Sequence, residues 1–580
     1  MNLCSFHDSA SGQWLTFRNP VRIVIANTPS EVLPALDLIE TLVNTRLLHA
    51  AGFISYEAAP AFDASLNVRP DSSGFPLLWF GLYEAPEIQT TLPTPANHPA
   101  PPPATWSPSI TPDQYRDAMA RLHTYLYNGD TYQVNYSHRL QAPFSNEPWP
   151  FFANLVQAQN AHHAAFVETD RFALCSASPE LFFQLEGDHI TARPMKGTAP
   201  RGRTTEEDRA CGEALRQSPK DRAENVMIVD MIRNDLGRIA TPGSVEPSAL
   251  FTLERYPTAW QMTSTVSAHT HASVREILTA LFPCASITGA PKSRTMAIIA
   301  ELETAPRRIY TGTIGFIAPN RQARFNVAIR TVLIDKAAGT AEYGVGGGIV
   351  WDSTSLSEYE ECRTKARVLT DQRPEFQLLE TLLWTPEDGA FLLDRHLQRL
   401  AGSADYFDYR ASEPEIRAAL QSWIDTRPAG PHRLRLLVAR DGTVTLQSQP
   451  IQASLDTPVK VALAPSPVDP SNPFLFHKTT HRQIYEQARS ACPDCEDVLL
   501  WNPAGELTES TIANLVADLD GDLVTPPIAC GLLPGTFRAA LLAEGRIREK
   551  VLHVADLPKC RHLWLINSVR KWRTAVLAGH

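Results

Sequence analysis

The sequence predicts a mixed α/β chain folded as two units, and three observations lead to this expectation. The chain has 580 residues, which is too long for one hydrophobic core. Strand-like runs such as VRIVIA and LLWFGLY alternate with amphipathic helical patterns. Two breaks interrupt the patterns, a proline-rich stretch at residues 91–109 and the segment TDQRPEFQLL from residue 370. We therefore expect segments 1–110, 111–371 and 376–580, of which the first two form one unit.

The bulk composition restricts the function classes. Hydrophobic residues make up 43% and charged residues 20% of the chain, which is a globular balance. The net charge of −10 argues against nucleic acid as a partner. No apolar run is long enough for a membrane span, and the N-terminus lacks the pattern of a signal peptide. The nine cysteines are sparse, which favours a reducing, cytoplasmic location.

Four carboxylates occur on two predicted helices. In SPKDRAENVMIVDMIRNDLGRIA, Ser218 is a good N-cap, and Asp221 and Glu224 are three residues apart on one face. SLSEYEECRTKARVL repeats this spacing with Glu358 and Glu361. Converging carboxylates could bind Mg²⁺, which prefers oxygen ligands.

Helix capping is the alternative for half of these acids. Ser218 with Asp221, and Ser355 with Glu358, each match a capping box, where an acid near the helix start offsets the dipole. Glu224 and Glu361 lie one turn deeper and are the better metal candidates.

Several stretches have the residue types of an anion site. Thr288 in SITGAPKSR precedes a proline and a helix, where free N–H groups could meet an anion. Arg330 lies in the strand-like run RFNVAIRTV and could form a bidentate contact with a carboxylate. Gly346 and Gly348 in YGVGGGIV allow close approach of a ligand. Lys196 in ARPMKGTAPRG could be a solvated charge, a phosphate clamp or a nucleophile.

The motifs of the first unit form an ordered set that identifies a family. SASPELFF, RPMKGTAPRG, DRAENVMIVDMIRNDLGR, SITGAPKSR, AIRT, GGGIV and SEYEECRTKA resemble the motifs of chorismate-utilising enzymes, which include anthranilate, isochorismate, salicylate and aminodeoxychorismate synthases. The resemblance covers about residues 115–370. It implies a large fold of stacked antiparallel sheets with flanking helices that binds chorismate on Mg²⁺.

The resemblance also implies roles for individual residues. Glu224 and Glu361 would be metal ligands, with Asp221 and Glu358 beside them. The substrate carboxylates would be bound by a set of residues on several loops: Arg330, Tyr310, Thr288, Gly346 and Gly348, with Lys365 nearby. Gln261 departs from the pattern, because many members have histidine there.

Lys196 distinguishes branches of the family. Anthranilate synthases carry alanine at this position, whereas aminodeoxychorismate synthases carry lysine in PIKGT. In the latter, the lysine is understood to attack ring carbon 2 of chorismate and expel the 4-hydroxyl, after which ammonia adds at carbon 4. Glu180 in SASPE matches the general acid that protonates the leaving oxygen.

The second unit contains the residue types that a pyridoxal phosphate site needs. Lys478 follows an apolar run in FHKTTHR, Glu509 lies between two strand-like runs, and Arg399 lies on an early predicted helix. GLLPGTFRAALL opens a helix with glycine and Thr536, which suits a phosphate. An amine, an acid and a phosphate site match the needs of this cofactor.

A second resemblance covers residues 376–578. ETLLW, DRHLQRLAGSADYF, HKTTHR, GELTESTIANL, TPPIACGLLPGTFR and INSVRKW are similar to motifs of the fold-type IV pyridoxal enzymes, which comprise aminotransferases and aminodeoxychorismate lyase. This resemblance implies a domain of two α/β subdomains. Lys478 would form the Schiff base and carry protons, and Glu509 would contact the pyridine nitrogen. Arg399, Thr536 and Ser568 would lie near the phosphate, and Thr381 near the reacting atoms.

Together the resemblances imply a bifunctional enzyme that makes 4-aminobenzoate from chorismate and ammonia. One alternative is an anthranilate-type synthase fused to a branched-chain or D-amino-acid aminotransferase. Another is a C-terminal unit that only supports the synthase. No cysteine of a glutamine amidotransferase site is visible, so we expect ammonia from solution or from a separate glutaminase subunit. Fold-type IV enzymes usually pair, which predicts a homodimer through residues 376–580.

Overall fold

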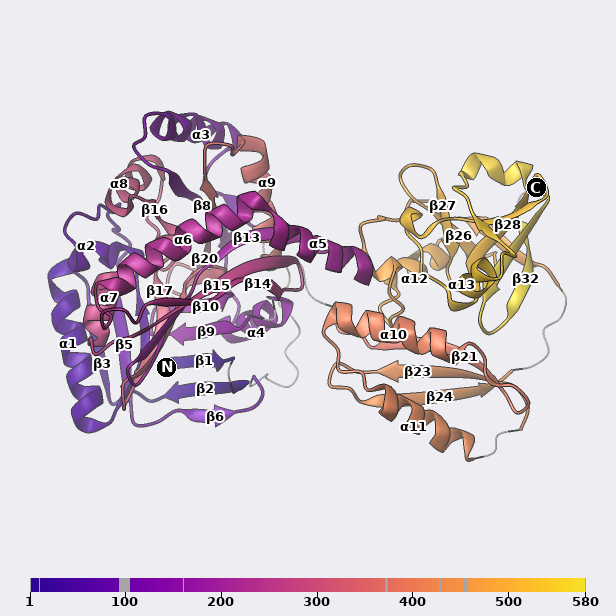
Figure 1. Ribbon diagram of the computed structural model, residues 1–580, viewed down its shortest axis with the longest axis horizontal. Coiled ribbons are helices and arrows are strands. Elements are labelled where there is room, and N and C mark those ends of the chain that lie inside the picture. Colours follow the sequence, from indigo (N-terminus) through magenta and orange to yellow (C-terminus); the bar gives the residue numbers. More distant parts are fainter. Residues whose placement is uncertain are drawn as a thin grey trace. The chain divides into compact units, whose positions relative to one another are not determined.

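The computed structural model describes residues 2–9, 11–92, 105–159, 161–370, 374–426, 429–451 and 457–578. These residues form two compact units (Figure 1). The first unit comprises Met1–Pro200 and Gly212–Arg373, and the second comprises Arg201–Cys211 and Pro374–His580. Most of the proline-rich connector and residues 371–373 of the second break lie outside the described residues.

Two ten-stranded sheets build the first unit, and all their pairings are antiparallel. The order in the first sheet is β16 (Gly289–Ala290), β8 (Gln133–Pro143), β20 (Thr340–Ile349), β19 (Thr331–Asp335), β10 (Phe172–Ser178), β9 (His163–Glu168), β1 (Leu3–Asp8), β2 (Gln13–Arg18) and β6 (Glu87–Gln89), with β7 (Ser107–Pro108) beside β8. The order in the second is β13 (Met195–Pro200), β15 (Ala259–His269), β12 (His189–Arg193), β11 (Leu181–Glu186), β18 (Gln322–Val327), β17 (Thr313–Ala318), β4 (His49–Ile54), β5 (Leu78–Tyr83) and β3 (Arg22–Ala26), with β14 (Glu246–Arg255) beside β15.

An apolar core joins the two sheets. Phe6 and Phe17 of the first sheet pack with Phe53 and Trp79 of the second in one buried cluster. Because side chains alternate between the faces of a strand, each sheet contributes one face to this core. The stacked antiparallel sheets predicted for this unit are confirmed.

Helices cover the outer faces of the sheets (Figure 1). The helices of this unit are α1 (Pro29–Arg46), α2 (Ala59–Phe62), α3 (Pro112–Tyr127), α4 (Pro148–Gln159), α6 (Pro219–Gly237), α7 (Val274–Leu281), α8 (Lys292–Leu302) and α9 (Ser355–Ala366), while α5 (Thr205–Gln217) belongs to both units. Ser218 caps α6 as predicted, because its hydroxyl accepts from Asp221 N at 3.3 Å. The predicted cap of α9 is wrong: Thr354, not Ser355, is the N-cap, and its hydroxyl accepts from Ser357 N.

The second unit has two sheets, in agreement with the predicted pair of subdomains. The smaller sheet has the order β22 (Gly389–Ala390), β21 (Leu378–Thr385), β23 (His432–Val438) and β24 (Val444–Pro450). The larger, mixed sheet contains β27 (Leu507–Ser510), β26 (Asp497–Trp501), β25 (Val459–Leu463), β32 (Lys571–Leu577), β31 (His562–Asn567), β28 (Asn514–Leu519), β29 (Asp522–Thr525) and β30 (Arg548–Glu549). The helices are α10 (Leu393–Phe407), α11 (Glu413–Ile424), α12 (Gln483–Ser490) and α13 (Thr536–Ala543).

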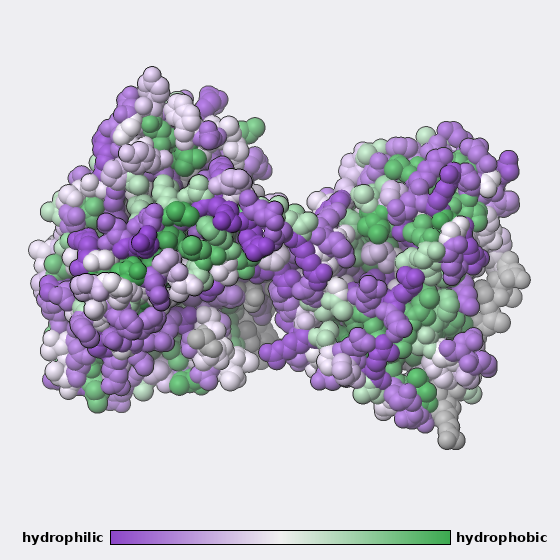
Figure 2. All heavy atoms as spheres, in the orientation of Figure 1, coloured by the Kyte–Doolittle hydropathy of each residue, from purple (hydrophilic) through white to green (hydrophobic). Residues whose placement is uncertain are grey.

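The surface of each unit mixes hydrophilic and hydrophobic residues (Figure 2). Within the described ranges, none of the helices has the length and hydropathy needed to cross a membrane.

Candidate active sites

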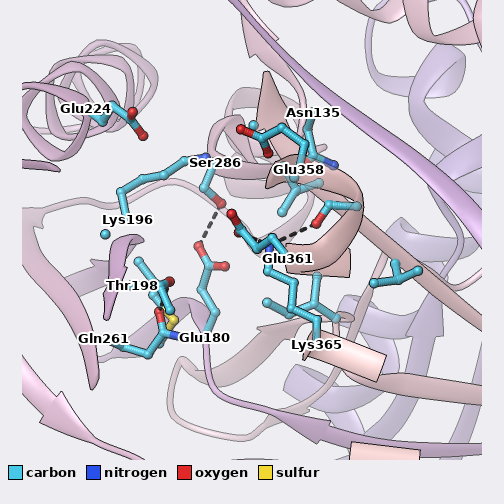
Figure 3. A pocket seen from close by; sticks show the side chains of 18 of the residues that line it. Asn135, Glu180, Lys196, Thr198, Glu224, Gln261, Ser286, Glu358, Glu361 and Lys365 are labelled. Carbon is cyan, nitrogen blue, oxygen red and sulfur yellow. Dashed lines mark hydrogen bonds and ion pairs between the residues drawn. The ribbon is translucent and has the colours of Figure 1, made fainter. Parts of the chain in front are cut away.

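The first unit contains a cavity of about 400 Å³ that most of its predicted site residues line. Figure 3 shows Lys196 and Glu180 on one side of this cavity, with Glu358 and Glu361 opposite and Glu224 on a separate helix. The predicted residues that line it are Lys196, Glu180, Asp221, Glu224, Glu358, Glu361, Arg330, Tyr310, Gly346, Gly348, Lys365 and Gln261. Segments that lie far apart in the sequence therefore meet at one site.

Lys196 lies on β13 and its amine points into the cavity (Figure 3). A Cβ atom added at Gly348 would lie 2.9 Å from Lys196 Nζ, so the amine lies directly beside this glycine. No hydrogen bond or ion pair joins Nζ to any residue that the structure describes. Removal from bulk water lowers the pKa of Lys196, and the negative charge of Glu224 opposes this shift. An unpaired amine with a lowered pKa has the properties of a nucleophile rather than of a solvated charge.

Glu180 is a buried acid beside Lys196. It immediately precedes β11 and is only 2% exposed. Burial raises the pKa of Glu180 to about 7, although the hydroxyl of Ser286 donates to its Oε1 at 2.7 Å and Lys196 also opposes the shift. A carboxyl group with this pKa can carry a proton near neutral pH and donate it to a leaving oxygen.

The four predicted metal ligands approach the cavity from α6 and α9. Burial raises the pKa of Glu224 and of Glu358, and neighbouring carboxylates add to both shifts. The Ser353 hydroxyl donates to Glu358 at 2.7 Å, and Glu358 also lies in the first turn of α9, where an acid offsets the helix dipole. Glu361 forms an ion pair with Lys365 at 2.7 Å.

The donor set suits a hard cation, but the side chains do not form a closed cage. Among the described residues, no three His, Cys, Asp or Glu side chains gather closely enough to hold a metal ion. Oxygen ligands on two helices, together with waters and substrate oxygens, are nevertheless what Mg²⁺ uses. The residues therefore fit Mg²⁺ in the presence of an oxygen-rich ligand.

A basic and aromatic end completes the cavity. Arg330 donates to Gln159 Oε1 at 2.7 Å, and its guanidinium lies 5.6 Å from the centre of the Tyr256 ring. The prediction that Arg330 lies in a strand is wrong. It occupies the bend between β18 and β19 with φ of 49°, and this bend turns the side chain towards the cavity. Lys365 Nζ donates to Gly346 O at 2.9 Å.

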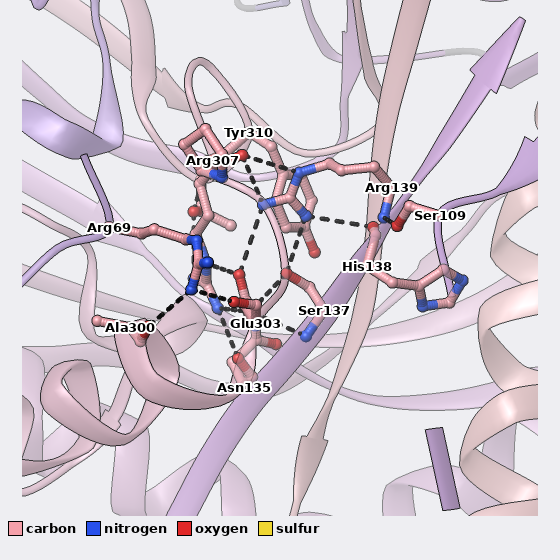
Figure 4. Close-up of polar contacts among 12 residues, drawn as sticks. Arg69, Ser109, Asn135, Ser137, His138, Arg139, Ala300, Glu303, Arg307 and Tyr310 are labelled. Carbon is pink, nitrogen blue, oxygen red and sulfur yellow. Dashed lines mark hydrogen bonds and ion pairs between the residues drawn. The ribbon is translucent and has the colours of Figure 1, made fainter. Parts of the chain in front are cut away.

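A buried polar network lies behind Tyr310 (Figure 4). Glu303 accepts hydrogen bonds from Arg307 at 2.6 Å and from the Ser137 hydroxyl at 2.7 Å. The guanidinium of Arg139 lies 5.1 Å from the centre of the Tyr310 ring. Because Glu303 is only 3% exposed, its charge is compensated almost entirely by these donors. The network fixes the wall of the cavity that carries Tyr310.

Thr288 is the predicted residue that the cavity does not include. It is fully buried, and its hydroxyl donates to Cys284 O and Ala285 O at 3.3 Å. Its role in binding the substrate stays a prediction. Conversely, the sequence analysis missed Ser286, Asn135 and Thr198, which line the cavity. Thr198 donates to Gln261 Oε1 at 3.0 Å, a contact between adjacent strands that no local pattern could have indicated.

The second unit has its own cavity, of about 890 Å³. It is lined by all the residues predicted for this unit: Lys478, Glu509, Arg399, Thr536, Ser568 and Thr381. Burial lowers the pKa of Lys478 to about 8, and the charges of Arg399 and Arg482 add to this shift. A substantial fraction of the amine is therefore neutral at neutral pH, as condensation with an aldehyde requires.

Glu509 is held in the floor of this cavity on β27. It is 4% exposed and accepts from the Tyr485 hydroxyl at 2.9 Å, from Asn514 Nδ2 at 3.1 Å and from Leu533 N at 3.1 Å. Burial raises the pKa of Glu509 to about 7. An acid with this pKa can share a proton with a pyridine nitrogen.

The predicted phosphate residues surround the start of α13. Thr536 is the first residue of this helix, where N–H groups lack partners within the helix. Arg399 donates to Glu380 through Nε and Nη2, and to Pro534 O through Nη1 at 3.0 Å. Ser568 donates to Thr381 O at 3.2 Å. With an amine, an acid and an anion site in one cavity, the residues fit pyridoxal phosphate.

Several arginines of this cavity were missed. Arg433 and Arg435 on β23, Arg482 before α12, and Arg570 and Arg573 near β32 line it as well. Alternation along β23 places Arg433 and Arg435 on the same face, which is a pattern visible in the sequence HRLRLLV. Cations around a cavity favour an anionic ligand.

Comparison with known proteins agrees with both descriptions. Residues 3–371 match the family of chorismate binding enzymes, and residues 377–576 match class IV amino-transferases. The aminodeoxychorismate synthase component 1 of Salmonella typhimurium is 42% identical over 260 residues, which cover 44% of this chain and 57% of that protein. The Escherichia coli protein of the same name is 40% identical over 271 residues, which cover 46% of this chain and 59% of that protein. The match thus spans less than two thirds of these relatives.

A solved structure supports the fold of the first unit. The anthranilate synthase component I of Streptococcus pneumoniae superimposes with a TM-score of 0.55 and 24% identity, over 62% of this chain and 92% of that one. The first unit thus shares the fold of that structure. The chain belongs to the family of chorismate binding enzymes, and it carries a class IV amino-transferase region after the chorismate-binding region.

Proposed function

We propose that this chain converts chorismate and ammonia into 4-aminobenzoate and pyruvate in two consecutive reactions, and thereby supplies a precursor of folate. The first unit would be an aminodeoxychorismate synthase and the second an aminodeoxychorismate lyase. The observation that carries the proposal is the Lys196 amine, which lies unpaired in a cavity with the buried acid Glu180 and the carboxylates of α6 and α9.

The synthase reaction uses Lys196 and Glu180 in turn. The neutral Lys196 amine bonds to ring carbon 2 of chorismate, the ring double bonds shift, and the bond from carbon 4 to its hydroxyl breaks. Glu180 gives its proton to the departing oxygen, which leaves as water. Ammonia then bonds to carbon 4, the double bonds shift back, and the Lys196 amine is released. Arg330 and Tyr310 line the same cavity, which supports a role for both in binding the substrate carboxylates.

Magnesium would be held by Glu224 and Glu361, with Asp221 and Glu358 beside them. When bound, it would supply positive charge that binds the ring carboxylate and draws electron density from the ring. The glutamate side chains extend from two helices, α6 and α9. Their charges face the end of the cavity where the ring carboxylate of the substrate would lie.

The lyase reaction would take place in the second unit. Pyridoxal phosphate, when bound, would act as an electron sink for the carbon that carries the substrate amine. Lys478 would hold the cofactor and remove the proton from ring carbon 4, Glu509 would contact the pyridine nitrogen, and Arg399, Thr536 and Ser568 would bind the phosphate. Loss of that proton and of the enolpyruvyl group makes the ring aromatic, which drives release of pyruvate.

Ammonia would come from a separate glutaminase subunit or from solution. The relatives named component 1 support this reading, because a component 1 implies a second component. A homodimer through the second unit is the further partner that we propose.

Product analysis tests the proposal. The purified chain, loaded with Mg²⁺ and pyridoxal phosphate, is incubated with chorismate and ammonium, and the products are separated and identified. We expect 4-aminobenzoate and pyruvate in equal amounts. Anthranilate as the main product would instead support an anthranilate-type synthase fused to an aminotransferase. This alternative is supported by similarity to an anthranilate synthase component 1 of Haloarcula marismortui, which is 38% identical over 270 residues.

A further inference from the structure

A short segment from the middle of the chorismate-binding sequence belongs to the second unit. Arg201–Cys211, which we call the strap, lies with the second unit, although residues on both sides of it lie with the first. The strap directly follows β13, the strand that carries Lys196. Its own fold is fixed by an ion pair in which Arg201 Nε donates to Asp208 at 2.7 Å, and both side chains are buried.

The strap binds along one face of α10. Arg201 Nη2 donates to Tyr406 O at 2.8 Å, and the Tyr406 hydroxyl donates back to Gly202 O at 2.7 Å. One turn earlier, the Thr205 hydroxyl donates to Gly402 O at 2.8 Å. Arg399, which lies on the same helix, lines the cofactor cavity. The strap therefore fixes the helix that supplies part of the phosphate site.

The strap also encloses the residues that precede Lys478. The guanidinium of Arg203 lies 5.2 Å from the centre of the Phe476 ring. His477 is 5% exposed, and its ring lies 4.3 Å from that of Tyr406. Burial lowers the pKa of His477 to about 4. The charge of Arg201 lowers this pKa further, whereas the Arg203 backbone and Asp208 oppose the shift. Arg203, and Tyr406 that the strap binds, therefore lie against the two residues that precede Lys478.

His477 and β21 together hold the backbone of Lys478. His477 Nδ1 pairs with the Ser403 hydroxyl at 3.0 Å, which joins this residue to α10. On the other side, Lys478 O accepts from Leu379 N at 3.0 Å. Because Lys478 is the next residue in the chain, a displacement of His477 would move the base of the lysine side chain.

We propose that the strap is a positioning element of the second active site, which places Lys478 through Tyr406 and His477. This inference rests on the proposed function of that site as a pyridoxal phosphate site. It means that a segment of the chorismate-binding sequence, only a few residues beyond Lys196, completes the support of the other catalytic lysine.

Two variants of the full-length chain test this proposal at different points of contact. Arg203→Met removes the charge that lies over Phe476, and Tyr406→Phe removes only the hydroxyl that binds Gly202 O. The matched controls are Arg216→Met, which breaks an exposed ion pair with Glu213 further along α5, and Tyr409→Phe, which removes the hydroxyl that binds Phe376 O at 2.5 Å. Thermal unfolding of all four variants reports whether each is folded.

The readouts are the dissociation constant of pyridoxal phosphate and the pH midpoint of its visible absorbance band. We expect each strap variant to bind the cofactor about three- to tenfold more weakly and to shift the pH midpoint, because each loses one contact between the strap and the residues that support Lys478. The controls should stay within about twofold of the wild type, as typical of changes away from a site. Strap variants that match their controls in both readouts would overturn the proposal.

The wild-type chain separates this inference from the proposed function. If it forms no visible band with pyridoxal phosphate, the proposed function of the second unit fails. If it forms the band and both strap variants behave as the controls do, only the positioning role of the strap fails.

Discussion

The two cavities each contain a lysine whose pKa is lowered by burial, but the largest charge effect on the pKa has the opposite sign in the two sites. Glu224 and Glu180 face Lys196 and oppose the effect of burial. Arg399 and Arg482 lie around Lys478 and strengthen it, so that the pKa falls to about 8. A fraction of the Lys478 amine is therefore neutral before any ligand binds to the second site. In the first site, neutralising the carboxylates would remove the charges that favour the protonated Lys196.

Replacement of Lys196 should have the largest effect, because it removes the amine of the first site. We expect Lys196→Ala to lower the rate of aminodeoxychorismate formation by about 10³-fold or more, because the group that bonds to the ring is lost. The visible absorbance of bound pyridoxal phosphate should not change, since Lys478 lies in the other unit. Product analysis and an absorbance spectrum of the same sample measure both. Retained synthase activity would show that Lys196 is not the nucleophile.

Replacement of Lys478 tests the amine of the second site. Lys478→Ala should lose the visible band and stop 4-aminobenzoate formation, again by about 10³-fold or more, because both the amine that holds the cofactor and the base are absent. Chorismate should still be consumed, and aminodeoxychorismate should accumulate. Normal 4-aminobenzoate formation in this variant would show that Lys478 is not the base of the lyase reaction.

The acid of the first site has a smaller expected effect. Glu180→Gln should lower the synthase rate by about 10²- to 10⁴-fold, the usual contribution of a general acid. Because the pKa of Glu180 is raised to about 7, its carboxyl group is protonated below this pH and loses the proton above it. The wild-type rate should therefore fall as pH rises through about 7. The variant should lose this dependence, and a pH profile that is unchanged in Glu180→Gln would assign the titration to another group.

Cofactor uptake reports the charge of Lys478. The neutral fraction of an amine with a pKa of about 8 falls roughly tenfold for each pH unit below that value. We expect the cofactor-free chain to take up pyridoxal phosphate about tenfold more slowly at pH 6 than at pH 7, with a plateau above pH 8. Stopped-flow absorbance measures the rate. A plateau that begins only near pH 10 would mean that the arginines do not lower the pKa of Lys478.

Local patterns predicted many of the elements, such as the capped helix at Ser218. The family resemblances predicted most of the residues that line the two cavities and indicated which distant segments meet. Patterns failed where the outcome depends on tertiary packing. Arg330 reads as part of a strand, yet its positive φ lies in a bend between two strands. Thr288 does not line the cavity and its hydroxyl donates to carbonyls of its own turn, so its role in binding the substrate stays a prediction.

Local sequence patterns do not predict which unit the strap packs with. Residues 205–217 have the features of an ordinary surface helix, and nothing in their periodicity indicates that the first part packs with the second unit. The strap packs with the second unit because of the buried Arg201–Asp208 ion pair and the hydrogen bonds to α10. Such contacts depend on residues about 200 positions away, which no short window includes.

Trapping of the covalent intermediate tests the central claim most directly. The chain is incubated with chorismate and Mg²⁺ in the absence of ammonia, digested, and examined by mass spectrometry. We predict that the peptide containing Lys196 gains the mass of chorismate less one water, and that ammonium added before digestion removes this adduct. An adduct on another residue, or aminodeoxychorismate formation by a chain in which Lys196 is never modified, would contradict the account.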